Sequence, residues 1–411
     1  MHSREKYLSV FNFEKKTTLK WEIGYWGGTI FRWYKEGLNK SDRNKKAAAF
    51  GKEIDKLIYD NSHLDKMGYG DGVMAEAAVF DDYDFSAFRE NEIHDLLGLD
   101  KGIYRVPLKN IIFPPFEKKI LEEKDNQLLV IEKNGCTVRK FKDNSSIPQI
   151  ISYPVNSRKD WGKFKEERLS IENIKERFPR KWDLIVKDLK ERDYPLYIGG
   201  DLAGFFGTIR EFVGIENLSY LFFDDPGLIK EINQYLLDLW INIYSEALTE
   251  IEADAAMIFE DMSYKYGSLI SPEMFREFLT PYYKKLTSFF KSKGINAIFV
   301  DTDGDCSGLI PLFLEAGVTG LLPIEGHYEN MNVLKLRRNY PELLILGGID
   351  KTVIEKGKDF IDNELENKIF PAIKLGGYIP TFDHLVHPQV SWSDFVYYRN
   401  KLNNFIEKNG I

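Results

Sequence analysis

Short apolar runs alternate with long amphipathic stretches through the second half of the chain. Each run is bounded by glycine, proline or an acidic residue, which is typical of a buried strand. One intervening stretch has Ser271 at the place of an N-cap, Pro272 at the first helical position and Gly294 at its end, so we expect a helix there. The expected strands are 194–200, 254–261, 295–303, 318–326, 342–350 and 376–384.

Strands that alternate with helices predict a parallel sheet with helices on its faces. Six such units after residue 190 form most of an α/β (β/α)8 TIM barrel, and a doubly wound open sheet is the alternative. Residues 17–28 are predicted to form another strand, with a helix beginning near Thr29. One more strand is needed, and both 71–80 and 106–113 qualify. We expect a single barrel domain over residues 1–411.

The segment 115–150 interrupts this alternation. Its apolar and polar residues alternate on both sides of Asn134 and Gly135. Asn-Gly is the strongest short-range signal for a two-residue turn between antiparallel strands. The segment is therefore predicted to be a β-hairpin insertion in the N-terminal half of the barrel.

Composition narrows the class of protein. The 411 residues are 43% hydrophobic and carry a net charge of -8, which is typical of a globular protein and argues against a nucleic-acid partner. The two cysteines, Cys136 and Cys306, cannot make a disulfide framework, which favours a reducing cytoplasm. No apolar run reaches the roughly 18 residues of a membrane span, and the N-terminus lacks a signal-peptide pattern. We expect a cytoplasmic protein without a membrane partner.

Acidic residues and histidines follow every predicted strand. The active site of a barrel lies at the carboxyl ends of its strands. Any one acid there could simply cap the next helix, but six consecutive cases favour a functional ring. Its members are Asp201; Glu260 and Asp261; Asp301 and Asp303; Glu325 and His327; Asp350; and Asp383 and His384.

Asp301 and Asp303 are the most informative pair in this ring. A calcium loop is excluded because Cys306 and Leu312 stand where such a loop needs Gly and a bidentate Glu. If the strand continues, alternation places both carboxylates on one face, where they could bind a metal or share a proton. Binding of substrate hydroxyls or amines and helix capping are the alternatives.

The chain resembles the uroporphyrinogen decarboxylase superfamily over roughly residues 190–405. The resemblance runs through "GGDLAGFFGTIREFVG", "VDTDGDCSGLIPLFLEAGVTGLLPIEG", "LLILGGIDKTVI" and "GGYIPTFDHLVHPQVSW". The superfamily contains the haem-pathway decarboxylase and the corrinoid-dependent methyltransferases, all on (β/α)8 barrels. It implies a barrel enzyme that acts on a small molecule, usually as a homodimer.

The chain departs from both branches of this superfamily. Where the decarboxylase has an Arg-rich stretch for its polycarboxylate substrate, this chain has "WEIGYWGGTIFRWY", with Glu22 and the single Arg32. Where the methyltransferases have a His-x-Cys zinc motif and a later Cys, this chain has Asp301, Asp303 and His384. These harder ligands suit zinc, manganese, iron(II) or magnesium.

The resemblance and the ring together predict metal-assisted methyl transfer between a small methylated substrate and a corrinoid on a partner protein. Decarboxylation of a carboxylated ring compound such as uroporphyrinogen III is the alternative, and a non-catalytic binding barrel is a third. A titrating imidazole makes His384 the first catalytic candidate. The predicted roles are catalysis for His384, Asp201 and Glu260; metal binding for Asp301, Asp303 and His384; and substrate binding for Glu22, Tyr25, Trp26, Tyr264, Glu325 and His327.

Overall fold

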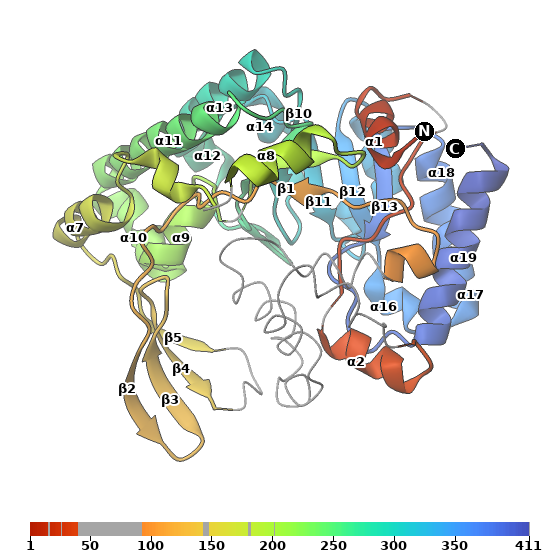
Figure 1. Ribbon diagram of the computed structural model, residues 1–411, viewed down its shortest axis with the longest axis horizontal. Coiled ribbons are helices and arrows are strands. Elements are labelled where there is room, and N and C mark those ends of the chain that lie inside the picture. The colour runs from red at the N-terminus through yellow and green to blue at the C-terminus, as the bar shows by residue number, and fades with distance from the viewer. Residues whose placement is uncertain are drawn as a thin grey trace.

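A curled parallel sheet of seven strands forms the centre of the protein in the computed structural model, which describes residues 1–14, 17–25, 27–39, 93–142, 148–179, 182–200 and 202–410 (Figure 1). Neighbouring strands pair in the order β1-β6-β7-β10-β11-β12-β13. The strands are β1 Tyr104–Arg105, β6 Leu196–Gly199, β7 Ala255–Phe259, β10 Ala297–Asp301, β11 Gly320–Ile324, β12 Leu344–Ile349 and β13 Tyr378–Phe382.

All six strands predicted in the second half are confirmed. Their pairing is parallel and in sequence order, so their carboxyl ends meet at one edge, as in a TIM barrel. The seventh strand, β1, lies immediately before the candidate 106–113, which is not itself a strand. The other candidate, 71–80, lies outside the described residues.

The predicted strand at 17–28 lies beside β13 without forming a regular ladder. Thr18 Oγ1 donates to the Tyr378 carbonyl at 2.8 Å, and the Ile23 N–H donates to Thr381 Oγ1 at 2.9 Å. A single parallel bridge joins Tyr25 to Val386. On its other side the Lys20 carbonyl accepts from the backbone N–H of Asp100 at 2.7 Å. Side-chain and isolated backbone hydrogen bonds therefore hold this segment between β13 and the chain that leads into β1.

The inner face of the sheet has its own apolar core, separate from the larger core between strands and helices. The parallel strands from β6 to β13 are largely buried on both faces, as expected for a sheet covered by helices. Burying a Leu, Ile or Phe side chain contributes roughly 1.5–3 kcal/mol, so these positions fix the curvature. The buried inner residues are Tyr7, Val10, Leu19, Trp21, Ala255, Ala297, Phe299, Leu322, Leu344, Leu346 and Ile379.

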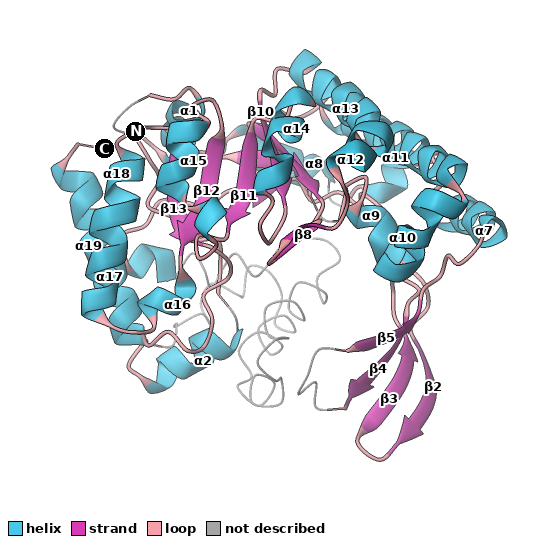
Figure 2. Cartoon of the chain, turned by 180° about the vertical axis from the view of Figure 1, so that it is seen from behind, coloured by secondary structure: helices cyan, strands magenta, loops and turns pink. Residues whose placement is uncertain are grey.

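Helices cover the outer face of the sheet (Figure 2). The predicted helix over 271–294 is divided into two, because Pro281 at the start of the second cannot donate a backbone hydrogen bond; Ser271 does cap the first, accepting from the Met274 N–H. The helices are α1 Ser3–Phe11, α2 Gly27–Lys35, α7 Arg158–Arg168, α8 Trp182–Lys190, α9 Gly207–Val213, α10 Ile215–Asp224, α11 Pro226–Ala247, α12 Pro272–Phe278, α13 Thr280–Ser292, α14 Ile310–Glu315, α15 Val333–Asn339, α16 Lys351–Ile354, α17 Lys358–Glu364, α18 Phe370–Ile373 and α19 Trp392–Lys408.

The segment predicted as a hairpin insertion contains a four-stranded antiparallel sheet. Its strands are β2 Lys119–Lys124, β3 Gln127–Ile131, β4 Thr137–Phe141 and β5 Gln149–Ser152. The Asn134-Gly135 pair lies between β3 and β4, which are antiparallel partners, and Gly135 has a φ of 84°. Two strands more than expected are present, and the sheet stands away from the parallel sheet (Figure 1).

No helix in the described part of the chain combines the length and apolarity needed to cross a membrane.

A short hairpin follows β7, made of β8 Ser263–Tyr264 and β9 Gly267–Ser268. It lies at the carboxyl ends of the strands, where the backbone N–H of Asp305 donates to the Tyr264 carbonyl at 3.1 Å. This hairpin forms one border of the site described next.

Candidate functional site

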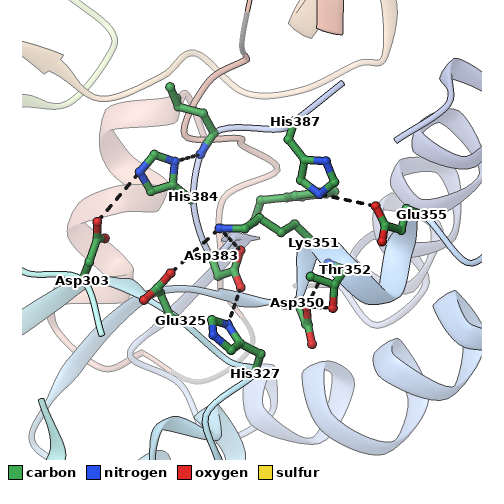
Figure 3. A network of polar contacts seen from close by, with 12 residues as sticks. Asp303, Glu325, His327, Asp350, Lys351, Thr352, Glu355, Asp383, His384 and His387 are labelled. Carbon is green, nitrogen blue, oxygen red and sulfur yellow. Dashed lines mark hydrogen bonds and ion pairs between the residues drawn. The ribbon is translucent and has the colours of Figure 1, made fainter. Parts of the chain in front are cut away.

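Charged side chains from four neighbouring strand ends converge at the carboxyl edge of the sheet (Figure 3). They follow β10, β11, β12 and β13, whose ordered parallel pairing brings them together although the chain separates them by up to about 80 residues. The converging residues are Asp303, Glu325, His327, Lys351, Asp383 and His384.

His384 is held in a defined orientation. The Leu385 N–H donates to its Nδ1 at 2.8 Å, so the neutral ring carries its proton on Nε2. Nε2 lies 4.0 Å from Asp303 Oδ2. Burial lowers the pKa of His384, and the nearby Lys351 cation lowers it further. A neutral imidazole therefore directs an N–H group toward Asp303.

The two aspartates after β10 are held in an environment that favours their protonated forms. Burial raises the pKa of Asp301 to about 8, with further contributions from Asp303 and Asp261. Burial also raises the pKa of Asp303 to about 7, and the charges of Glu325 and Asp261 act in the same direction. Asp303 consequently gains or loses a proton close to neutral pH.

The turn after β10 determines where Asp303 lies. Strand β10 ends at Asp301, and Gly304 has a φ of 79°. A Cβ at Gly304 would lie 2.7 Å from the Ser263 carbonyl carbon, so only glycine allows the loop to pack against the β8–β9 hairpin. The Gly304 N–H also donates to Glu325 Oε2 at 2.7 Å. The loop is thereby fixed to the end of β11.

A lysine occupies the centre of the site. Lys351 Nζ lies 3.6 Å from Asp383 Oδ1 and 3.9 Å from Glu325 Oε1. Asp383 is completely buried, and its Oδ2 lies 3.4 Å from His327 Nδ1. That hydrogen bond raises the pKa of His327. Glu325 and His327, both predicted to bind substrate, therefore belong to one charged network with Asp383.

Glu260 lies at the end of β7 but is committed to internal contacts. It is fully buried, and its carboxylate accepts hydrogen bonds from the backbone N–H groups of Phe205, Phe206 and Gly207 at 2.7–2.9 Å and from the Tyr283 hydroxyl at 2.6 Å. These donors hold the start of α9 against β7. No contact supports the predicted catalytic role of Glu260, which stays a prediction.

Glu22 is likewise part of the interior. Its carboxylate pairs with Arg399 at 2.8 Å, with both side chains fully buried, and accepts from the Tyr398 hydroxyl at 2.6 Å. The Thr381 hydroxyl and the Phe382 N–H donate to its other oxygen at 2.9 and 3.0 Å. These contacts join the 17–25 segment to β13 and α19. They give no support to the predicted contact with substrate.

The remaining predicted residues separate into three groups. Tyr25 is completely buried and packs edge-to-face against Trp33 and Phe395, so it belongs to the aromatic core. Tyr264 is 59% exposed on the β8–β9 hairpin at the border of the site. Trp26 and Asp201 lie outside the described residues.

Sequence reasoning missed Lys351 and gave Asp383 no individual role. Lys351 directly follows Asp350, which caps α16 by accepting from the Thr352 N–H at 2.9 Å. Lys351 therefore follows a strand-ending acid in the sequence, but the predicted ring of strand-end residues contained only acids and histidines. Asp383 precedes His384 in the predicted strand end, and only the fold shows its burial.

The predicted metal ligands do not come together as a metal site. Among the described residues, no group of three or more His, Cys, Asp or Glu side chains is arranged to hold a metal ion. Asp303 and His384 approach each other, but their close polar contact involves no third ligand of that kind in this part of the chain. These residues do not fit the predicted site for zinc, manganese or iron.

The fold and the site place this protein in the class of TIM-barrel-like α/β proteins, with its candidate site at the carboxyl ends of parallel strands. A model of the uroporphyrinogen decarboxylase (URO-D) family matches residues 127–396. The chain belongs to this family, as its motifs predicted.

A solved structure also resembles the whole chain. A methyltransferase from Methanosarcina mazei is 15% identical, with a TM-score of 0.59, and the match covers 98% of this chain and 100% of that chain. At this identity the likeness shows the fold. The search of curated proteins gave no match. The family match therefore carries the assignment to the uroporphyrinogen decarboxylase family, and the neighbour supports the barrel-like fold.

Proposed function

We propose that this protein transfers a methyl group between a heteroatom of a small substrate and a corrinoid carried by a partner protein, and that Asp303 and His384 handle the accompanying proton. The observation that carries the proposal is the Asp303–His384 pair. Its atoms Oδ2 and Nε2 are 4.0 Å apart at the carboxyl edge of the sheet. Both side chains are about one-third exposed there, so a substrate can reach them.

The proton requirement follows from the reaction. When a carbon–heteroatom bond to a methyl group breaks, the heteroatom retains the bonding electrons and needs a proton. Asp303, with a pKa of about 7, is partly protonated at neutral pH and can donate that proton. The carboxylate that results can then accept a hydrogen bond from Nε2–H of His384. In the opposite direction the same pair would receive the proton of the methyl acceptor.

A corrinoid would supply the cobalt centre that exchanges the methyl group. The exposed border of the site offers an aromatic face to a flat macrocycle: Tyr264 and Tyr266 are 59% and 85% exposed on the β8–β9 hairpin, with rings 6.3 Å apart and inclined at 70°, so one ring at a time can lie flat against such a ligand. Aromatic faces stack on flat ligands. We assign these two residues to the contact with the corrinoid or its carrier protein. A homodimer in the cytoplasm stays a prediction.

Decarboxylation of uroporphyrinogen III is the weaker alternative. The charge of the site opposes a substrate with several carboxylates, because Asp303, Glu325 and Asp383 converge there. Lys351 is the cation at the centre, and it already pairs with Glu325 and Asp383. Recognition of multiple carboxylates requires several fixed cations, above all arginine.

Free cob(I)alamin provides a direct test. The purified protein is mixed with it and with panels of methyl ethers, N-methyl amines and methyl sulfides, and methylation is followed by visible absorption. We expect protein-dependent methylation with one class of substrate and a roughly 100-fold or greater loss in Asp303→Asn, the size of a general-acid contribution.

The matched control is Asp305→Asn, two residues further along the same loop. Asp305 accepts hydrogen bonds from Ser307 and Asn330, so its carboxylate is held by its own loop neighbours and this variant should retain the wild-type rate. Carbon dioxide release from uroporphyrinogen III, without methyl transfer to or from any substrate, would contradict the proposal.

A further inference from the structure

His327 and Asp383 form a second proton-handling pair beside Asp303 and His384. We propose that Asp383 positions His327 so that its Nε2 accepts a hydrogen bond, or a proton, from a hydroxyl or N–H group of the substrate. This inference rests on the proposed function only in placing the substrate at this edge of the sheet. It adds a substrate class: molecules with a free O–H or N–H group in addition to the heteroatom that bears the methyl group.

The orientation of Asp383 is the first step of the argument. Asp383 is completely buried after β13, and its Oδ1 faces Lys351 Nζ at 3.6 Å. Oδ1 has no hydrogen-bond partner within the described chain, so the Lys351 ion pair is the contact that compensates its charge. The second oxygen, Oδ2, faces His327 Nδ1 at 3.4 Å. Lys351 thus fixes the carboxylate in the orientation that contacts the imidazole.

The tautomer of His327 follows from this contact. A carboxylate accepts hydrogen bonds but cannot donate them, so Nδ1 of His327 carries a proton. In the neutral ring Nε2 then has a free lone pair. The His327 side chain is 34% exposed, while the ring of Tyr328 covers part of it with a centroid separation of 3.9 Å. The imidazole therefore presents a basic nitrogen at an accessible position.

The two histidines of the site are in opposite tautomers. At His384 the backbone N–H of Leu385 donates to Nδ1, which leaves the proton on Nε2. At His327 the Asp383 carboxylate accepts from Nδ1, which leaves the lone pair on Nε2. Figure 3 shows the two rings around the shared Asp383 and Lys351. The site consequently offers one hydrogen-bond donor and one acceptor from imidazoles.

The charges around His327 support the role of an acceptor. Groups from every neighbouring strand end face it: Glu325, Asp350, Lys351 and Asp383, together with Tyr328 beside it. The Asp383 hydrogen bond raises the pKa of His327, burial lowers it, and the charges of Glu325, Asp383 and Asp350 raise it. A raised pKa makes Nε2 a stronger base and a stronger hydrogen-bond acceptor.

This pairing defines which substrates fit. A molecule with only a methylated heteroatom uses the Asp303–His384 pair and leaves the His327 lone pair unsatisfied. A molecule with an additional hydroxyl or N–H group can donate to Nε2 of His327. A substrate with an ionised carboxylate in place of that hydroxyl or N–H group would be repelled by Asp383 and Glu325. We therefore expect hydroxylated methyl ethers, or methylated amines with a free N–H group, to bind in preference to fully methylated analogues.

The test is a measurement of histidine tautomers by NMR on the full-length protein labelled with ¹⁵N in its six histidines. Correlations between ring nitrogens and carbon-bound ring protons distinguish the two neutral tautomers. At about pH 8.5, above the usual range of imidazole titration, we expect Nδ1–H for His327. His327→Gln identifies its signals by their loss. An Nε2–H tautomer at His327 in the wild-type protein would overturn the proposal.

Asp383→Asn adds a second readout. Without the carboxylate, the Nδ1–H form of His327 should lose its preference, and the pKa measured from its ¹⁵N shifts should fall. Glu355→Gln is the matched control, because it removes a carboxylate from another histidine pair, His387 Nε2–Glu355 Oε2 at 3.9 Å. It should leave the His327 tautomer and pKa unchanged.

These outcomes separate this inference from the proposed function. If Asp383→Asn does not fold, the wild-type tautomer still decides the proposal. If His327 has the Nδ1–H tautomer but no methyl transfer occurs, the proposed function is wrong and the positioning role of Asp383 stands. If methyl transfer occurs but His327 has the Nε2–H tautomer or an unraised pKa, the positioning role is wrong.

Discussion

Two sets of carboxylates lie near the strand ends of this protein, and their surroundings differ. Glu22 and Glu260 are fully buried, and each accepts four or more hydrogen bonds from protein donors. Asp301 and Asp303, at and just after the end of the neighbouring strand β10, are less completely buried, and neighbouring acids help to raise their pKa values to about 8 and about 7. The first set holds elements together, and the second set can exchange protons with a substrate.

The difference shows that residue type at a strand end does not determine its role. All four carboxylates were equally good candidates from the sequence. A buried carboxylate whose oxygens are occupied by N–H, hydroxyl and guanidinium donors is stabilised as a structural anchor. A carboxylate that faces other carboxylates and a neutral imidazole has no such compensation, and its proton becomes available to chemistry.

Removal of Glu22 should have the largest effect on stability. Glu22→Ala leaves the fully buried Arg399 guanidinium without its carboxylate, and breaking one side of a buried ion pair costs about 3–5 kcal/mol. The free energy of unfolding in urea measures the loss. Glu315→Ala, which removes a half-exposed partner of Lys284, is the control and should cost less than about 1 kcal/mol. Equal losses for the two variants would contradict the role of Glu22.

Glu260→Gln should have an intermediate effect. The amide group that replaces one oxygen faces backbone N–H donors at residues 205–207, so at least one donor loses its acceptor. An unsatisfied buried donor costs roughly 1–3 kcal/mol. Thermal unfolding measures it, with Glu277→Gln, an exposed partner of Lys230, as the control. A stable Glu260→Gln protein that has lost activity would place Glu260 in the chemistry instead.

Asp301→Asn should have an effect of the opposite sign, and one that depends on pH. The folded protein raises the pKa of Asp301 from 3.8 to about 8, so between these values the folded state binds more protons than the unfolded state. Stability from this group is complete below about pH 4 and is lost as pH rises through about 8. Asp301→Asn should therefore weaken the decline of stability toward alkaline pH and stabilise the protein there, by at most roughly 6 kcal/mol for a shift from 3.8 to about 8.

The pH dependence itself is the check on that result. Unfolding free energies of the wild type and Asp301→Asn are compared from about pH 5 to about pH 9. Parallel curves would show that Asp301 is ionised throughout this range. Asp301 would then not belong to the set of carboxyl groups whose pKa values are raised.

The sequence predicted the parallel sheet well because its strands are continuous apolar runs with clear boundaries. All six strands after residue 190 were located, and the order of pairing followed from their alternation with helices. The edge strand β1 was missed because a strand of two residues gives no periodic pattern in the sequence. The 17–25 segment was predicted as a strand, but side-chain hydrogen bonds from Thr18 and to Thr381 replace its ladder, and no pattern encodes such bonds.

The site was predicted only in part. The position of the strand ends led to Asp303, Glu325, His327 and His384, which the structure brings together at the carboxyl edge of the sheet; their roles stay predictions. The internal partners of Glu22 and Glu260 come from distant segments, such as Arg399 and Tyr283, and no local pattern connects them. Lys351 was missed because its importance comes from the two carboxylates that surround it in space.

The pKa of Asp303 tests the central claim most directly. The claim is that this carboxyl group exchanges a proton near neutral pH. It can be measured without a substrate, from the ¹³C shift of aspartate carboxyl carbons during a pH titration, with Asp303→Asn identifying the signal. We predict a midpoint of about 7. A midpoint at or below the ordinary value of 3.8 would show an Asp303 that is ionised at neutral pH, and it would contradict the account.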